Sequence, residues 1–246
     1  MMALLLIAVL IGAWQLYADL SDVDDLILPS PSEVATALWD DRALLWDNLL
    51  VTAQEVALGI LAAVVLGFVC AVALHFSRTL RRATYPLLVA SQAIPIVVVA
   101  PLLIVWLGFG MAPKVAIIAL ICFFPIVVTT LDGLGRVDRD TLKLLRTLDA
   151  SRWAAFRFAE APAALPAALS GAKIAVAIAV IGAVFAEYSG SSEGLGHLIL
   201  QAIPQLETAR AWAAVLVLAA FAVALFYALD LAQRRLVPWT ANERNP

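Results

Sequence analysis

The chain has 246 residues, of which 63% are hydrophobic and 14% are charged, and its formal net charge is −3. A soluble domain has roughly 45–50% apolar and about 25% charged residues, so this composition predicts an integral membrane protein. Cys70 and Cys122 lie inside apolar runs and are expected to be small packing residues rather than a disulfide. The sequence contains no P-loop and no dinucleotide-binding glycine motif, and it has two histidines. We therefore expect no cofactor, no metal site and no nucleic-acid partner.

Six apolar runs predict an all-α protein with six transmembrane helices in one domain over residues 1–246. Each run approaches or exceeds the length needed to cross a hydrocarbon core of about 30 Å. A signal peptide is the alternative for the first run, but no basic residue precedes it, which favours a retained helix. Residues 33–46 are amphipathic, and we expect them to form a surface helix capped by Ser32. The six runs are 2–18, 48–76, 85–107, 114–131, 167–186 and 209–231.

The distribution of basic residues predicts the orientation. With six spans, twelve Lys and Arg residues fall on one side of the membrane and only Arg42, Lys114 and Arg210 fall on the other. Basic residues gather on the cytoplasmic side, so both termini and the loop 132–166 are expected to be cytoplasmic. Lys173, just inside the fifth run, is expected to extend its ammonium group to the cytoplasmic interface.

The central loop has the pattern of a helix, a break and a second helix. Leu142, Leu145 and Leu148 recur at helical spacing, and Asp138 and Ser151 are candidate N-caps for the two helices. The second helix is expected to end at Pro162. Such a segment either lies on the bilayer surface or fits a groove on a soluble partner.

Residues 144–166, with SGAKI at 170–174, resemble the Glu-Ala-Ala loop of binding-protein-dependent ABC importer permeases. Pro162 matches the proline of that motif, whereas Asp149 stands at its glycine and Lys143, Leu144 and Leu145 stand at its Glu-Ala-Ala. Further stretches resemble, in order and spacing, the branch that carries nitrate, sulfonates, taurine and pyrimidine precursors. These stretches are LPSPSEV (28–34), QAIPIVVVAPLLIVWLGFGMAPK (92–114), FFPIVVTTLDGL (123–134) and AEYSGSSEGLGHLI (186–199).

The resemblance implies a type I ABC importer permease fold, with residues 132–166 as a cytoplasmic coupling loop. It implies a multi-pass protein of the bacterial inner (plasma) membrane that is not itself an enzyme. Its expected partners are two copies of a cytoplasmic ATP-binding subunit, an extracytoplasmic solute-binding protein, a second copy of the permease and the lipid bilayer. The positions expected to contact or support the ATPase are Leu145, Asp149, Ala150, Ser151, Arg152, Trp153, Pro162 and Pro166. Aspartate is one of the few residues that tolerate a left-handed backbone, which Asp149 needs if the glycine position requires one.

The translocation path is expected to involve Ser91, Gln92, Pro95 and Glu187. The first three interrupt the third run, where prolines free backbone groups that either line a path or pack as an ordinary kink. Glu55 and Glu187 lie near the outer ends of their runs and are expected to be solvated.

The sequence constrains the transported substrate less than it constrains the fold. The sequence between 91 and 134 is most similar to permeases for thiamine-precursor pyrimidines or riboflavin, and nitrate, sulfonate and taurine permeases are the alternative. A self-contained secondary transporter is an alternative of another class, but it is expected to show mid-span ionisable residues or an internal repeat. The stretch GSSEG at 190–194 matches G-x-S-x-G, which requires a preceding strand to act as a nucleophile elbow.

Overall fold

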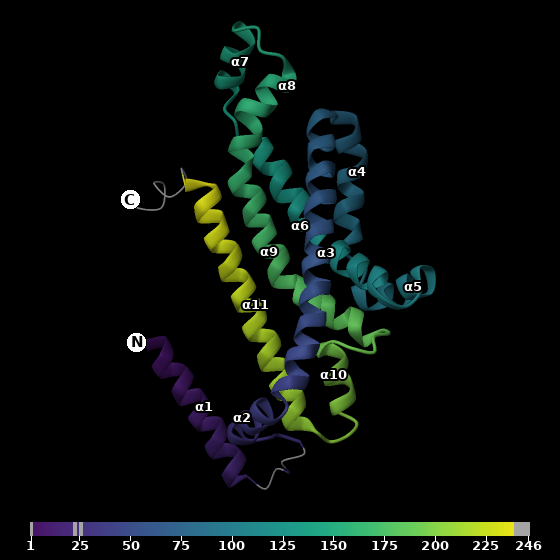
Figure 1. The fold of residues 1–246 in the computed structure, drawn as a ribbon. Helices are drawn as coiled ribbons and strands as arrows, with labels where there is room; N and C mark the ends of the chain where they lie inside the picture. The colour runs from purple at the N-terminus through teal and green to yellow at the C-terminus, as the bar shows by residue number, and fades with distance from the viewer. Residues whose placement is uncertain (1, 22–23, 25–26, 239–246) are drawn as a thin grey trace.

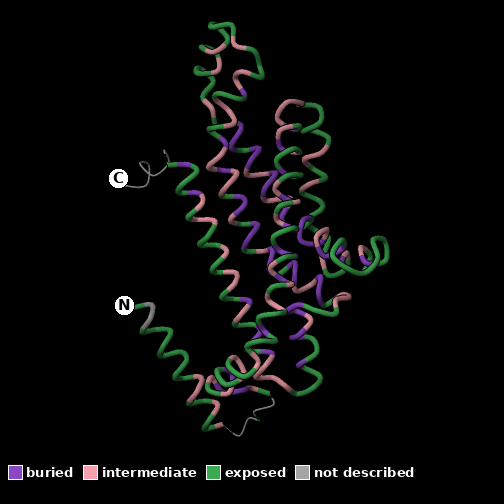
Figure 2. The backbone as a smooth tube through the Cα atoms, in the orientation of Figure 1, coloured by how far each residue is buried: buried purple, intermediate pink, exposed green. Residues whose placement is uncertain are grey.

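The computed structural model describes residues 2–21, 24 and 27–238, and all regular secondary structure within these ranges is helical. Four long helices run roughly alongside one another: α3 (Arg42–Phe76), α6 (Met111–Leu134), α9 (Ala161–Tyr188) and α11 (Thr208–Leu236) (Figure 1). Helices α3, α6 and α9 pack against one another at the centre, and α11 packs against α9. Most of the buried residues lie along this central group, whereas α1 (Met2–Leu20) is largely exposed (Figure 2).

Glycines allow the central helices to approach closely. A Cβ at Gly59 of α3 would lie 2.5 Å from the Cβ of Ile118 on α6, and one at Gly133 would lie 2.8 Å from the Cβ of Ala167 on α9. Helices in a membrane associate through such close packing, because lipid tails provide no hydrophobic drive. The small residues in these runs therefore fix which helix faces meet.

Four of the expected spans are present as long apolar helices in the described residues, corresponding to the second, fourth, fifth and sixth runs. The third run is not a straight span. It divides into α4 (Arg78–Ser91) and α5 (Ile96–Leu107), and the chain bends by 103° between them. Pro95 is the N-cap of α5. The first run forms α1, whose apolar part Leu5–Leu20 is shorter than the other spans. Helices of sufficient length and apolarity thus number four, or five if the bent pair is one span.

The segment after α1 differs from the sequence-based expectation. The N-cap of α2 (Pro31–Asp40) is Ser30, not Ser32: Ser30 Oγ accepts from Glu33 N at 3.3 Å, and Glu33 Oε2 accepts from Ser30 N at 2.8 Å. Proline is favoured at the first helical position, so Pro31 places the cap one residue before itself. The chain then turns at Asp41 and α3 begins at Arg42, so residues 33–46 are not one helix.

The helix that begins after Ser151 does not end at Pro162. Helix α8 (Arg152–Ala155) leads into a π-helical turn, η1 (Phe156–Glu160), and then directly into α9. Ala161 N bonds to Phe156 O, five residues back, and Pro162 follows at the start of α9. The wider turn accommodates a proline that lacks the N–H needed for an α-helical bond.

Opposite ends of the bundle carry different short helices. Helices α7 (Arg139–Thr147) and α8 project beyond one end, and α2 and α10 (Leu195–Ala202) lie at the other (Figure 1).

Candidate functional site

The connection between α7 and α8 forms a sharp elbow. Asp149 has φ = 59°, which confirms a left-handed backbone at the position of the family's glycine. The turn is closed by hydrogen bonds from Leu148 N to Leu144 O (3.1 Å) and from Ala150 N to Leu145 O (3.0 Å). Ser151 Oγ accepts from Ala154 N at 3.1 Å and caps α8 as predicted, while Asp138 occupies the N-cap position of α7 without a side-chain hydrogen bond. We call residues 144–153 the elbow.

The elbow is attached to the end of α3. Arg152 donates to the backbone oxygen of Phe76 at 2.9 Å, and its guanidinium lies 4.9 Å from the centroid of the Phe76 ring. Trp153 stacks on Phe156, whose ring centroid is also 5.2 Å from that of Phe76. The last carbonyls of a helix have no partner within it, so Arg152 satisfies one of them while holding the elbow in place.

Large apolar side chains of the elbow are uncovered. Leu144 is 60% exposed, Leu148 70% and Trp153 60%. Helix α7 contains no buried residue. Asp149, Ser151 and Arg152 are also exposed, whereas Leu145 and Ala150 are half-buried; Pro162 and Pro166 lie further along, in α9. Exposed apolar surface framed by polar residues is typical of an interaction site.

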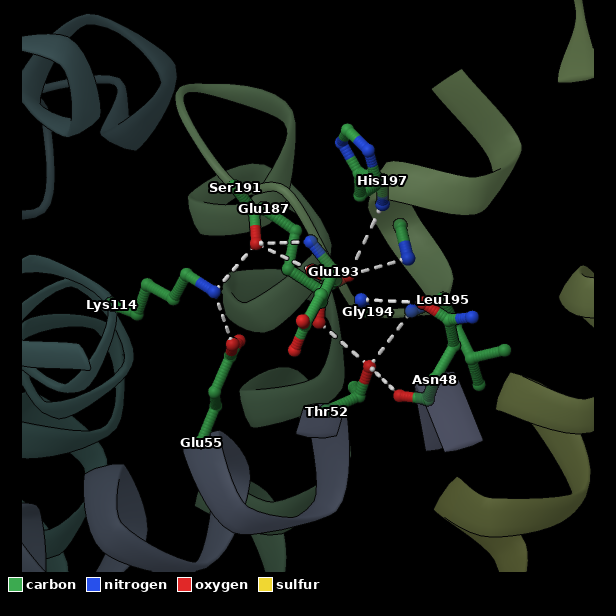
Figure 3. A network of polar contacts seen from close by, with 11 residues as sticks. Asn48, Thr52, Glu55, Lys114, Glu187, Ser191, Glu193, Gly194, Leu195 and His197 are labelled. Carbon is green, nitrogen blue, oxygen red and sulfur yellow. Dashed lines mark hydrogen bonds and ion pairs between the residues drawn. The ribbon is translucent and has the colours of Figure 1, made fainter. Parts of the chain in front are cut away.

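A second candidate site is a buried polar network at the other end of the bundle (Figure 3). Glu55 on α3 and Glu187 on α9 are both fully buried, so the expectation that they are solvated is wrong. Glu55 Oε1 lies 2.5 Å from Lys114 Nζ, which also donates to Ser191 Oγ at 2.6 Å. A buried carboxylate requires such a partner, because an unpaired charge is costly in a medium of low dielectric constant.

Glu187 is stabilised by the start of α10. Its Oε2 accepts from Gly196 N at 2.5 Å and from His197 N at 3.3 Å, and its Oε1 accepts from Thr52 Oγ1 at 2.6 Å. Thr52 Oγ1 in turn accepts from Leu195 N at 3.0 Å. The first N–H groups of a helix have no internal partner and carry a partial positive charge, which suits a carboxylate. Glu187 therefore ties α9 to α3 and α10.

The connection between α9 and α10 rules out a nucleophile elbow. GSSEG follows a helix rather than a strand, since α9 ends at Tyr188. Ser191 Oγ is engaged by Lys114 and accepts from Glu193 N at 3.2 Å. Gly194, with φ = 110°, is the N-cap of α10, and its N–H donates to Asn48 Oδ1 at 2.7 Å. These residues position the polar network rather than a reacting serine.

A hollow of about 750 Å³ lies beside this network. Gln54, Glu55, Phe109, Lys114 and Glu193 are among its lining residues. Phe109 is 81% exposed and presents an aromatic face. The hollow thus combines two carboxylates, one ammonium group, an amide and an aromatic ring.

The other predicted path residues lie elsewhere. Ser91, Gln92 and Pro95 are exposed at the break between α4 and α5, where Ser91 Oγ donates to Leu88 O at 2.7 Å. None of the three lines the hollow beside Glu55. The structure therefore does not bring Glu187 together with the other three.

Sequence reasoning missed several partners. Lys173 pairs with Asp230 of α11, a partner that the sequence analysis did not identify. Lys114, the first residue of the fourth run, is buried against Glu55. A lone acid in one apolar run and a lone base in another would have indicated each pair, because charges inside a membrane are nearly always paired.

Comparisons with known proteins agree with this architecture. Residues 63–242 match the family described as the binding-protein-dependent transport system inner membrane component. A probable ABC transporter permease of Haemophilus influenzae is 39% identical over 234 residues, covering 95% of this chain and 96% of the relative. The riboflavin transport system permease protein RibX of Chloroflexus aurantiacus is 36% identical, covering 93% of this chain and 86% of the relative. The formylaminopyrimidine transport permease protein ThiX of Halalkalibacterium halodurans is 33% identical, covering 87% and 86%.

A solved structure shares the fold. The inward-facing MetNI methionine ABC transporter gives a TM-score of 0.63 at 18% identity, covering 86% of this chain and 97% of that chain. The family match spans well over half of the sequence, and the helices that it covers include both the elbow and most of the polar network. The chain belongs to the inner membrane component family of binding-protein-dependent transport systems, the permeases of ABC importers.

Proposed function

We propose that two copies of this permease form the path for a small solute, which an extracytoplasmic binding protein delivers and two cytoplasmic ATPase subunits drive. The observation that carries the proposal is the elbow, whose exposed Leu144, Leu148 and Trp153 have no cover within the described chain. A soluble ATPase with an apolar groove would cover them. The elbow end of the bundle is then cytoplasmic, together with both termini, in the bacterial inner membrane.

The attachment of the elbow explains how force would be transmitted. The bond from Arg152 to Phe76 O and the stacked Trp153 and Phe156 rings link the elbow to α3. The uninterrupted helical path from Arg152 to Tyr188 links it to α9. A movement of the ATPase groove would thus reach two central helices together. The permease has an inward-open and an outward-open orientation, and the nucleotide state of the ATPase determines which of the two it binds more tightly through the elbow. This difference in affinity shifts the equilibrium between the two orientations.

The chemistry of the hollow favours an uncharged, nitrogen-rich heterocycle over an anion. Its lining holds two carboxylates, Glu55 and Glu193, against the single ammonium group of Lys114. A sulfonate or nitrate would meet this excess of negative charge, whereas a pyrimidine or flavin ring offers N–H donors and a face that stacks on Phe109. RibX and ThiX, named for riboflavin and formylaminopyrimidine, are consistent with this preference. In this proposal the path is bordered in two separate places, by Ser91, Gln92 and Pro95 at the exposed break between α4 and α5 and by the network of the buried Glu187 beside the hollow.

The test is co-purification of an ATPase subunit with matched tryptophan variants. Trp153 on the elbow and Trp39 on α2 are 60% and 70% exposed, respectively. We expect Trp153→Ala to lose most of the bound ATPase and Trp39→Ala to retain it. Equal retention by both variants would remove the elbow as the docking site. Transport by the reconstituted permease alone, without an ATPase, would instead support a self-contained secondary transporter.

A further inference from the structure

Three arginines lie on one face of the first turns of α4. Arg78, Arg81 and Arg82 follow the i, i+3, i+4 spacing, and Tyr85 continues the same face one turn later. The three arginines are exposed and Tyr85 is half-buried. Together with Pro86 these residues line a surface hollow of about 460 Å³. We call Arg78, Arg81 and Arg82 the arginine stripe.

The positive charge of the arginine stripe is not compensated within the described chain. None of the three guanidinium groups forms an ion pair there, and the first turn of α4 contains no acidic residue. Cations at the beginning of a helix oppose the helix dipole, and like charges one turn apart repel one another. An anion bound at the hollow would relieve both effects.

The arginine stripe also marks a change from polar to apolar surface. Along α4 the sequence passes from RTLRRAT to YPLLVAS, and no residue of the helix is buried. Beyond Tyr85, Leu87 is 69% exposed and Val89, on the face of the stripe, is 49% exposed. Tyrosine is enriched at the boundary between headgroups and hydrocarbon. With Tyr85 at that boundary, the arginines would lie at the depth of lipid phosphates, next to apolar surface suited to acyl chains.

A second hollow extends the positively charged surface of the arginine stripe toward the elbow. It has a volume of about 770 Å³, and its lining includes Arg78 and Arg81 together with Arg146 and Arg152. Its one carboxylate, that of Glu160, is bonded to His75 at 2.8 Å. Arg146 and Arg152 of the elbow thus add to the positive electrostatic potential around the arginine stripe.

We propose that the arginine stripe binds the phosphate of an anionic phospholipid headgroup, with the acyl chains lying against the exposed apolar surface of α4. Guanidinium groups bind phosphate through paired, charge-assisted hydrogen bonds. The continuity of the hollow with apolar surface favours a lipid over a soluble phosphate. Among the residues that the structure describes, those lining the hollow of about 460 Å³ at the arginine stripe include none of the elbow and none that lines the hollow beside Glu55.

The test measures lipid retention by the purified permease. The protein is equilibrated with mixed micelles of phosphatidylglycerol and phosphatidylcholine in equal parts, and the retained lipids are counted by native mass spectrometry. The test variant is Arg78→Gln, Arg81→Gln, Arg82→Gln. The matched control is Arg136→Gln, Arg139→Gln, Lys143→Gln, which removes the same charge from exposed positions near α7.

Wild type and control are expected to retain phosphatidylglycerol selectively. The stripe variant is expected to lose roughly tenfold or more of that selectivity, because each basic side chain near an anionic surface contributes about a factor of five. A melting temperature equal to that of wild type shows that the variant is folded. If the triple variant does not fold, Arg81→Gln alone should still lose at least roughly twofold.

Two results would overturn the proposal. One is that the stripe variant retains phosphatidylglycerol as wild type does; if that variant also loses the ATPase subunit, the arginines are assigned to a protein partner instead. The other is that soluble glycerol phosphate displaces the lipid at equal concentration, which would identify a soluble anion as the ligand.

Discussion

Replacing Lys114 with methionine should strongly destabilise the permease. Lys114 is the ion-pair partner of Glu55, which is fully buried, and the second oxygen of that carboxylate, Oε2, has no hydrogen-bond partner. Methionine keeps the length of the side chain but leaves the carboxylate without a counter-charge. Removing one member of a buried ion pair costs about 3–5 kcal/mol. For a chain of this size the melting temperature should fall by roughly 10 °C.

The double variant Lys114→Met, Glu55→Gln separates charge from packing. Neutralising both partners removes the unpaired buried charge, so the double variant should be more stable than Lys114→Met alone. The assay is thermal unfolding in detergent, followed by tryptophan fluorescence. The reasoning fails if Lys114→Met has the same melting temperature as wild type, or if the double variant melts no higher than Lys114→Met alone.

Two further predictions concern backbone geometry. Asp149→Gly should preserve or increase ATPase co-purification, whereas Asp149→Val should reduce it, because a β-branched residue at φ = 59° is strained by about 1–2 kcal/mol; equal binding by the two variants would contradict this. Gly196→Ala should lower the melting temperature by several degrees, because the added Cβ would lie 2.8 Å from Glu187 Oε2 and 3.0 Å from Val184 Cα. Gly12→Ala is its control, since nothing lies within 4 Å of the Cβ that it adds.

Helix identity and the elbow followed from the sequence because they depend on local patterns. Apolar runs long enough to cross a bilayer located the four long helices, and Ser151 marked the start of α8. Asp149 stands where the family has glycine, and aspartate was expected to tolerate a left-handed backbone if that position required one, which is the backbone observed. Each of these features is determined by residues close together in the chain.

The polar network could not be predicted in the same way. Glu55 and Lys114 are 59 positions apart, and Thr52 and Glu187 are 135 apart. Hydropathy places these residues near the ends of their apolar runs, and this position led to the expectation that they are solvated. Only the packing of α3, α6 and α9 shows that they face one another. The break in the third run was visible as Pro95, but its angle depends on how α5 packs against α6 and α9.

The helical path from Arg152 to Tyr188 has a mechanical consequence. It contains 37 residues, which corresponds to a rod of about 55 Å. A tilt of roughly 3° about its elbow end displaces its far end by about 3 Å, enough to separate any hydrogen-bonded pair. Glu187 occupies that far end, and its bond to Thr52 measures 2.6 Å. If ATPase docking tilts this rod, as the proposed coupling requires, the contacts of Glu187 would be displaced further than any contact nearer the elbow.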